Sequence, residues 1–304
     1  MTTAGVEFEM IDLNKTPCID AALAFIEATR SSLGVGQPIT GERFAYEVGV
    51  FGTHETLNPV YSLFNKFWLD KAAWMINCEP RFITLTGIVK KLRWPLLYDA
   101  NLHISNYAAE IPVCREKLDE LTASLESERN LILASSLLNL IAARSLDTQA
   151  ANAAMAIHNE LVSTLRSSMA SLVSNIERIS VELETCLTEA RSNPLAIEAT
   201  TGTASMPTEQ MLSASRAMSE YAVELETQTC GPEFLKEVDT THGRFSAEVS
   251  IPALSRFVEL HNMLLATLSA ESRLLAENLG NSAQGYMRTD AMAASVVTDL
   301  AADL

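Results

Sequence analysis

The chain has 304 residues, of which 48% are hydrophobic, so it can bury a sizeable core as one large domain or as two ordinary ones. Its 22 Lys and Arg residues against 38 Asp and Glu residues give a formal net charge of −16, which repels phosphate backbones and leaves nucleic-acid binding unsupported. No segment reaches the roughly 20 apolar residues that a membrane-spanning helix needs, so membrane insertion is not expected.

The cysteines and the first residues bear on the compartment. The five cysteines lie far apart, their number is odd, and none forms a CxxC motif, which favours a reduced chain. Residues 1–15 lack the basic start and the continuous apolar stretch of a secretory signal. These features predict a cytoplasmic protein and disfavour export.

Residues 1–112 are predicted to form a small, loop-rich, partly helical region. The spacing of apolar residues predicts helices over 19–33 and 60–76. The segment between them contains glycines, and its residues Phe44, Tyr46, Val48 and Val50 alternate with polar or small residues, as short strands do.

Two long helices are predicted after this region, because no glycine or proline occurs between Pro112 and Pro194. The first helix is expected from about Val113 to Arg144. Asp147 is the predicted N-cap of the second helix. Apolar residues then follow at alternating spacings of three and four, which is the seam of helices that pack nearly parallel or antiparallel: Val162, Leu165, Met169, Leu172, Ile176, Ile179 and Leu183.

Three further helices are expected downstream, over about 208–230, 252–280 and 287–300, with glycine or proline between them. Residues 113–304 are therefore predicted to form one bundle. The fold class expected is all-α, a long helical bundle with a small, loop-rich N-terminal region. The long helices also predict a homo-oligomer.

Motifs for phosphate and metal binding are missing from the sequence. Neither GxxxxGK[ST] nor GxGxxG occurs, and the histidines are isolated with no HExxH motif, so no metal and no cofactor is expected. His158 falls in register with the apolar seam. It is either a hydrogen-bonded core histidine or an inward-facing acid or base.

The loop from Thr200 to Met211, with the sequence TTGTASMPTEQM, lies between two long helical segments. It is either an ordinary interhelical loop rich in Ser and Thr or a mobile loop that carries proton-transfer groups. Its GTASMP stretch, residues 202–207, resembles the GSSxMPxKxN loop of the aspartase/fumarase superfamily, which includes argininosuccinate lyase and adenylosuccinate lyase. The family's serine, lysine and asparagine correspond here to Ala204, Glu209 and Met211.

The resemblance implies a lyase that removes a proton next to a carboxylate and then expels an amine or oxygen leaving group from a small substrate. It implies Ser205 or Thr203 in place of the missing serine, and His242 or His158 as the acid.

For binding that substrate, the resemblance implies Arg244 as the carboxylate-binding group and Gly202 and Glu209 as neighbours of the substrate. The alternative hypothesis is a non-catalytic helical self-assembly or scaffold protein, including a capsid-like subunit. It is favoured by the acidic composition, the long apolar seam and the missing catalytic groups.

Overall fold

The computed structural model describes residues 16–34, 54–66, 73–135, 140–192 and 208–302. Within these ranges the regular elements are all helices and there is no strand, which confirms the all-α prediction. The strand-like alternation from Phe44 to Val50 lies outside the described residues.

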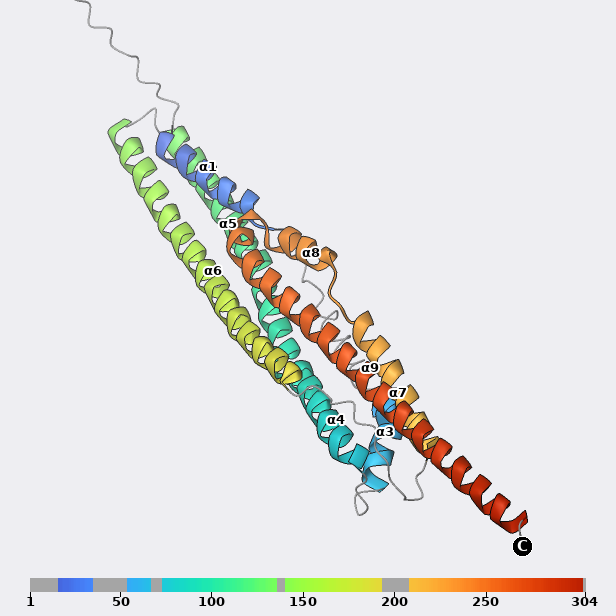
Figure 1. Ribbon diagram of the computed structural model, residues 1–304. Coiled ribbons are helices and arrows are strands. Elements are labelled where there is room, and N and C mark those ends of the chain that lie inside the picture. Colours follow the sequence, from blue (N-terminus) through green and yellow to red (C-terminus); the bar gives the residue numbers. More distant parts are fainter. Residues whose placement is uncertain (1–15, 35–53, 67–72, 136–139, 193–207, 303–304) are drawn as a thin grey trace, which may run out of the picture. The chain divides into compact units, whose positions relative to one another are not determined.

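Figure 1 shows the described helices, coloured in chain order. In order they are α1 (Pro17–Ser32), α3 (His54–Lys66), α4 (Ala73–Lys91), the π-helix η1 (Leu92–Leu97), α5 (Tyr98–Ser135), α6 (Leu140–Arg191), α7 (Thr208–Thr227), α8 (Pro232–His242) and α9 (Arg244–Ala302). The expected long helices are therefore present as α5 and α6, and a third one, α9, is longer still. In the part of the chain that the structure describes, no helix combines the length and the apolar character needed to cross a bilayer.

Several helix boundaries differ from the predicted ones because prolines and glycines lie inside helices. Helix α5 begins at Tyr98 and continues through Pro112, so the predicted start near Val113 is wrong. A proline inside a helix removes one backbone hydrogen bond and crowds the preceding turn. Its neighbours Ile111 and Cys114 are buried, however, and their packing holds the helix together across the proline.

Helix α9 shows the same effect, since it runs without a break through Pro252 and Gly280. The separate helices predicted over 252–280 and 287–300 are therefore wrong. At Gly280 an added Cβ atom would lie 3.2 Å from the Ser215 hydroxyl oxygen of α7, so glycine at this position permits close helix contact.

The described contacts divide the chain into two compact units. The first unit comprises residues 1–39, 106–172 and 236–251, and the second comprises residues 40–105, 173–235 and 252–304. Helices α5, α6 and α9 each contribute residues to both units. The predicted division of the chain into residues 1–112 and 113–304 stays a prediction.

In the first unit, α1 lies along the antiparallel helices α5 and α6. The Asp147 carboxylate accepts hydrogen bonds from the backbone N–H groups of Cys18, at 3.1 Å, and Ile19, at 3.0 Å. Asp147 was expected to cap its own helix, but it lies inside α6 and caps α1 instead. Arg129 of α5 also pairs with Asp20 of α1 at 2.9 Å.

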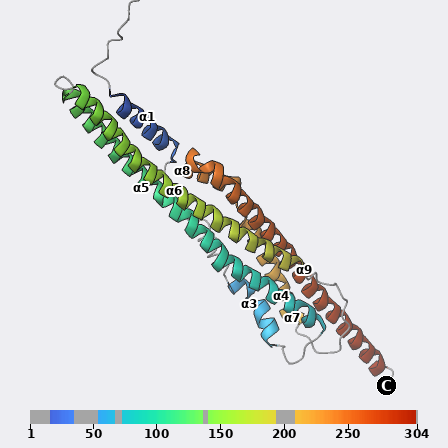
Figure 2. The same cartoon turned by 90° about the vertical axis from the view of Figure 1, so that its left-hand side faces the viewer.

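In the second unit, α7 and α9 form an antiparallel pair that can be followed in Figures 1 and 2. The Ser215 hydroxyl donates a hydrogen bond of 2.7 Å to the carbonyl of Ala276. Nearer the end of α7, Glu226 accepts hydrogen bonds from Ser269 at 2.9 Å and from Arg273 at 2.7 Å. Residues later in α7 contact residues earlier in α9, so the two helices run in opposite directions.

Candidate functional site

The residues predicted as a site have different positions in the structure. Gly202, Thr203 and Ser205 lie outside the described residues. Glu209 is exposed in the first turn of α7, in the second unit. The predicted roles of these residues stay predictions.

His242 is the last residue of α8 and is fully buried in the first unit. Its Nδ1 atom lies 3.2 Å from the Ser250 hydroxyl oxygen, and its ring meets the Tyr107 ring edge to face at a centroid distance of 4.8 Å. Burial lowers the pKa of His242 to about 4, so the ring is neutral at pH 7. The surroundings of His242 are those of a core side chain.

His158 and Arg244 also belong to the first unit. The His158 ring is buried between α6 and α1, where its Nε2 atom lies 2.9 Å from the Thr29 hydroxyl oxygen and its ring contacts Phe25. Arg244 is the first residue of α9, and its side chain is exposed. His158 therefore links two helices, and its catalytic role, like that of Arg244, stays a prediction.

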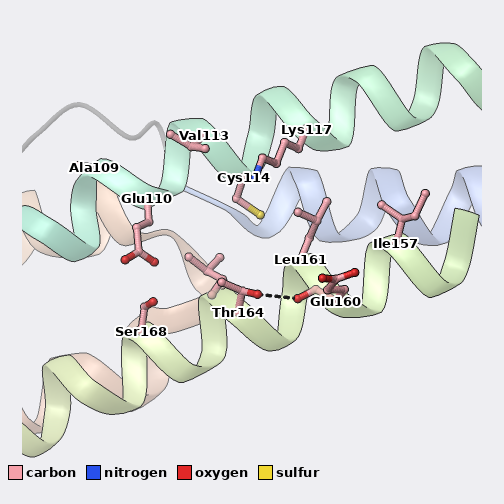
Figure 3. Close-up of a pocket in the computed structure, with 11 residues that line it drawn as sticks. Ala109, Glu110, Val113, Cys114, Lys117, Ile157, Glu160, Leu161, Thr164 and Ser168 are labelled. Carbon is pink, nitrogen blue, oxygen red and sulfur yellow. Dashed lines mark hydrogen bonds between the residues drawn. The ribbon is translucent and has the colours of Figure 1, made fainter.

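A groove between α5 and α6 is the best candidate for a functional site in the first unit (Figure 3). Its volume is about 550 Å³. Helix α5 contributes Ala109, Glu110, Val113, Cys114 and Lys117, and helix α6 contributes Ile157, Glu160, Leu161, Thr164, Leu165 and Ser168. Figure 3 shows α1 behind the helix pair, while the groove side chains project between α5 and α6.

The groove is partly apolar at its surface. Val113 is 50% exposed and Ile157 is 49% exposed, although both are large hydrophobic residues. On α6, Ile157 belongs to a second apolar stripe beside the buried seam, with members that are exposed or half-buried and follow at spacings of three and four: Leu146, Ala150, Ala153, Ile157 and Leu161. Large apolar residues in an open groove are typical of a surface that binds another protein.

Three charged residues line the groove, and none of them forms an ion pair with another described residue. Glu110 lies near one end, close to Ser168, and Glu160 lies toward the other end, near Ile157 (Figure 3). Lys117 is one heptad beyond Glu110 on α5. The groove therefore offers both signs of charge around an apolar centre.

The reactive groups near the groove are few. Burial raises the pKa of the Cys114 thiol, so the thiol is neutral at pH 7 and a weak nucleophile. No histidine lines the groove. Among the described residues, no three His, Cys, Asp or Glu side chains gather in a way that could bind a metal ion. The groove is better suited to binding than to acid–base chemistry.

Sequence reasoning missed this groove for two reasons. The α6 stripe from Leu146 to Leu161 has the helical spacing that would have revealed it, but the neighbouring buried seam has the same period. The α5 residues contribute no such pattern, because Lys117 occupies a position at which a stripe would need an apolar residue.

Comparison with known proteins found a family match for part of the chain. Residues 200–299 match the family model described as "Excreted virulence factor EspC, type VII ESX diderm". The matched range is about one third of the 304 residues and contains α7, α8 and most of α9. No curated protein and no solved structure gave a match.

This match corrects the predicted relationship and activity. The resemblance to the aspartase/fumarase superfamily is wrong, and so is the lyase function that it implied. The six residues from Gly202 to Pro207 that carried the resemblance lie inside the range that matches the other family. Small and hydroxyl-bearing residues before a proline are also common at the start of a helix, so the motif held little family information.

The predicted cytoplasmic location is wrong for the same reason, since the matching family is described as excreted. A basic start followed by an apolar stretch marks only one class of exported protein. That pattern does not detect a protein exported without such a signal, and widely spaced cysteines do not identify a compartment on their own.

Proposed function

We propose that this chain is an excreted, non-catalytic helical protein of a type VII ESX system and that it acts by binding proteins through its helical surfaces. The match of residues 200–299 to the EspC family model is the observation that carries this proposal. The alternative predicted from the sequence, a helical self-assembly or scaffold protein, agrees with it better than the lyase did.

The structure of the matched range supports a binding role. Helices α7 and α9 are joined by hydrogen bonds from Ser215 to Ala276 and from Ser269 and Arg273 to Glu226. Cys230 and Asn262 add two more, between the backbone of Cys230 and the Asn262 amide, at 2.8 Å and 3.0 Å. A helix pair fixed at several points along its length presents a defined surface to a partner.

The groove of the first unit supports the same role. Its exposed Val113 and Ile157 lie at positions where a partner helix would remove them from water, which is the main source of binding free energy in helix association. The charges beside them, which form no ion pair with the residues that the structure describes, would set the orientation and choice of partner. We infer that self-association through the long helices is one form of this binding.

Excretion can be tested with the 304-residue chain carrying an epitope tag. In a bacterium with a working type VII ESX system, we expect the protein to accumulate in the culture medium. In the same strain with the system inactivated, we expect it to remain in the cells. Immunoblots of the medium and the cell pellet measure the two fractions.

A tagged cytoplasmic protein expressed in the same cultures controls for cell lysis. Equal release from both strains, or full retention in both, would show that the chain is not exported by this route and would overturn the proposed function.

A further inference from the structure

We propose that the groove between α5 and α6 binds the same groove of a second copy of this chain, with Lys117 of each copy facing Glu110 of the other. This rests on the proposed binding function and identifies one surface and one partner for it. Because the groove residues belong to the first unit, the interface needs no contribution from the second unit.

The spacing of the two charges carries the proposal. Glu110 and Lys117 are seven positions apart on α5, so they lie on the same side of the helix nearly two turns from each other. Midway between them are Val113, which is half exposed, and Cys114. If a second copy of α5 crosses in the opposite direction at this midpoint, its position 117 lies opposite position 110 of the first copy.

A two-fold axis at the midpoint forms this charge pair twice. In such an interface each copy uses the same surface, and any contact between two different positions recurs with the roles exchanged. Lys117 of the first copy faces Glu110 of the second, and Glu110 of the first faces Lys117 of the second. Neither residue forms an ion pair within its own chain among the described residues, so both are available.

Apolar residues lie between and beside the charges. Val113 lies between Glu110 and Lys117 on α5, while Leu161 and Ile157 line the α6 side of the groove, with Ile157 at the end away from Glu110 (Figure 3). A second copy would cover them with the same three residues. Helices α5 and α6 of the two copies would then form four helices around a shared apolar centre, which is a common way to bury such stripes.

The net charge of −16 per chain opposes association of two copies. Most of this charge lies away from the groove, and repulsion between distant charges is screened over about 10 Å at 0.1 M salt. Charges in direct contact are screened much less. A second copy is therefore favoured at this surface by the local arrangement of Glu110 and Lys117, and we expect dimer formation at moderate rather than very low ionic strength.

Charge exchange tests the arrangement directly, with the molar mass measured by sedimentation equilibrium in 0.15 M salt. The 304-residue wild type is expected to have the mass of a dimer. Lys117→Glu and Glu110→Lys are each expected to give a monomer, because like charges then face each other. An equimolar mixture of the two single variants is expected to restore a dimer, and so is the double variant Glu110→Lys/Lys117→Glu.

Two matched controls carry the same changes in charge at exposed positions outside the groove. Glu116→Lys on α5 and Lys236→Glu on α8 are both expected to remain dimers. Circular dichroism reports whether each variant keeps its helices. If a charge variant loses its helices, Ile157→Ser decides the question, because this half-exposed position is expected to tolerate serine in the fold but not in the dimer.

A monomeric wild type would overturn the proposal, as would single variants that stay dimeric or a mixture that stays monomeric. Binding of a basic helical peptide to a monomeric wild type would show that a different protein occupies the groove. The excretion experiment is read separately. An excreted monomer contradicts this inference alone, whereas a dimer that remains in the cells contradicts the proposed function alone.

Discussion

The two units fix the ends of their helices with opposite charges. In the first unit, the buried Asp147 carboxylate binds the backbone N–H groups at the start of α1. In the second unit, the buried Arg81 guanidinium of α4 donates a hydrogen bond to the carbonyl of Ala190, in the last turn of α6. Both arrangements follow the helix dipole, which is positive at the start of a helix and negative at its end.

Asp147 and Arg81, the two charged anchors, differ in how completely their polar atoms are hydrogen-bonded. Both Asp147 oxygens accept backbone hydrogen bonds, and no cation is needed. Arg81 has five N–H groups, and it also pairs with Glu271, with its Nη2 atom 2.6 Å from the Glu271 carboxylate, while its Nη1 atom has no hydrogen-bond partner among the described residues. The N–H groups at the start of α1 supply a hydrogen bond to each Asp147 oxygen, whereas the carbonyl at the end of α6 accepts from only one of the Arg81 nitrogens. We therefore expect the second unit to depend more strongly on its anchor.

The largest effect is expected from Arg81→Leu, which leaves Glu271 and the Ala190 carbonyl without their partner. Breaking a buried ion pair from one side typically lowers the free energy of unfolding by about 3–5 kcal/mol. Urea denaturation followed by circular dichroism measures the change. The double variant Arg81→Leu/Glu271→Leu should be less destabilised than the single one, because it leaves no unpaired charge.

Arg273→Ala is the matched control, since this exposed arginine also pairs with a glutamate across helices and should have an effect below about 1 kcal/mol. Equal effects at Arg81 and Arg273 would show that burial does not distinguish the two ion pairs.

A smaller loss of stability is expected on acidification. It can be compared between the units at two buried histidines, His242 in the first unit and His261 in the second. Burial lowers the pKa of both His242 and His261 to about 4, from about 6.5 in the unfolded chain. Between these values the unfolded chain binds more protons than the folded one, so stability is fully present above pH 6.5 and is lost as the pH falls toward 4. Each ring contributes at most about 3 kcal/mol to this loss.

Replacing either ring by asparagine should reduce the fall in the free energy of unfolding between pH 7 and pH 4.5. Chemical denaturation at a series of pH values measures the slope for His242→Asn, His261→Asn and the wild type. If His242→Asn keeps the wild-type slope while His261→Asn reduces it, the acid sensitivity belongs to the second unit alone.

The smallest effect is expected from Asp147→Ala, which removes the cap of α1. Loss of an N-cap costs about 1–2 kcal/mol, and the loss should be confined to α1 because α6 does not depend on this side chain. Hydrogen exchange of the Cys18 and Ile19 amides should therefore accelerate more than exchange in α6. Asp147→Asn, which keeps one carbonyl oxygen as an acceptor, should be intermediate, and Asp119→Ala, at a more exposed carboxylate, should leave these two amides protected.

The candidate site could be predicted only in part. The apolar stripe on α6 that contains Ile157 and Leu161 can be recognised from its spacing. Its partners Glu110, Val113 and Lys117 lie about 45 residues earlier in the chain, and no local pattern links the two sets. The predicted loop at Gly202 came from a short motif of small residues, which is a weak indicator of function.

The sequence by itself determined that this protein is helical. A long span without glycine or proline and a regular apolar seam from Val162 to Leu183 leave few alternatives to long helices, because both features act along the local chain. Only the tertiary structure decided where the helices begin and end and what their polar residues do. Packing against other helices outweighs the cost of Pro112 and Pro252, and Asp147 caps α1 rather than α6, because these outcomes depend on residues that are distant in sequence.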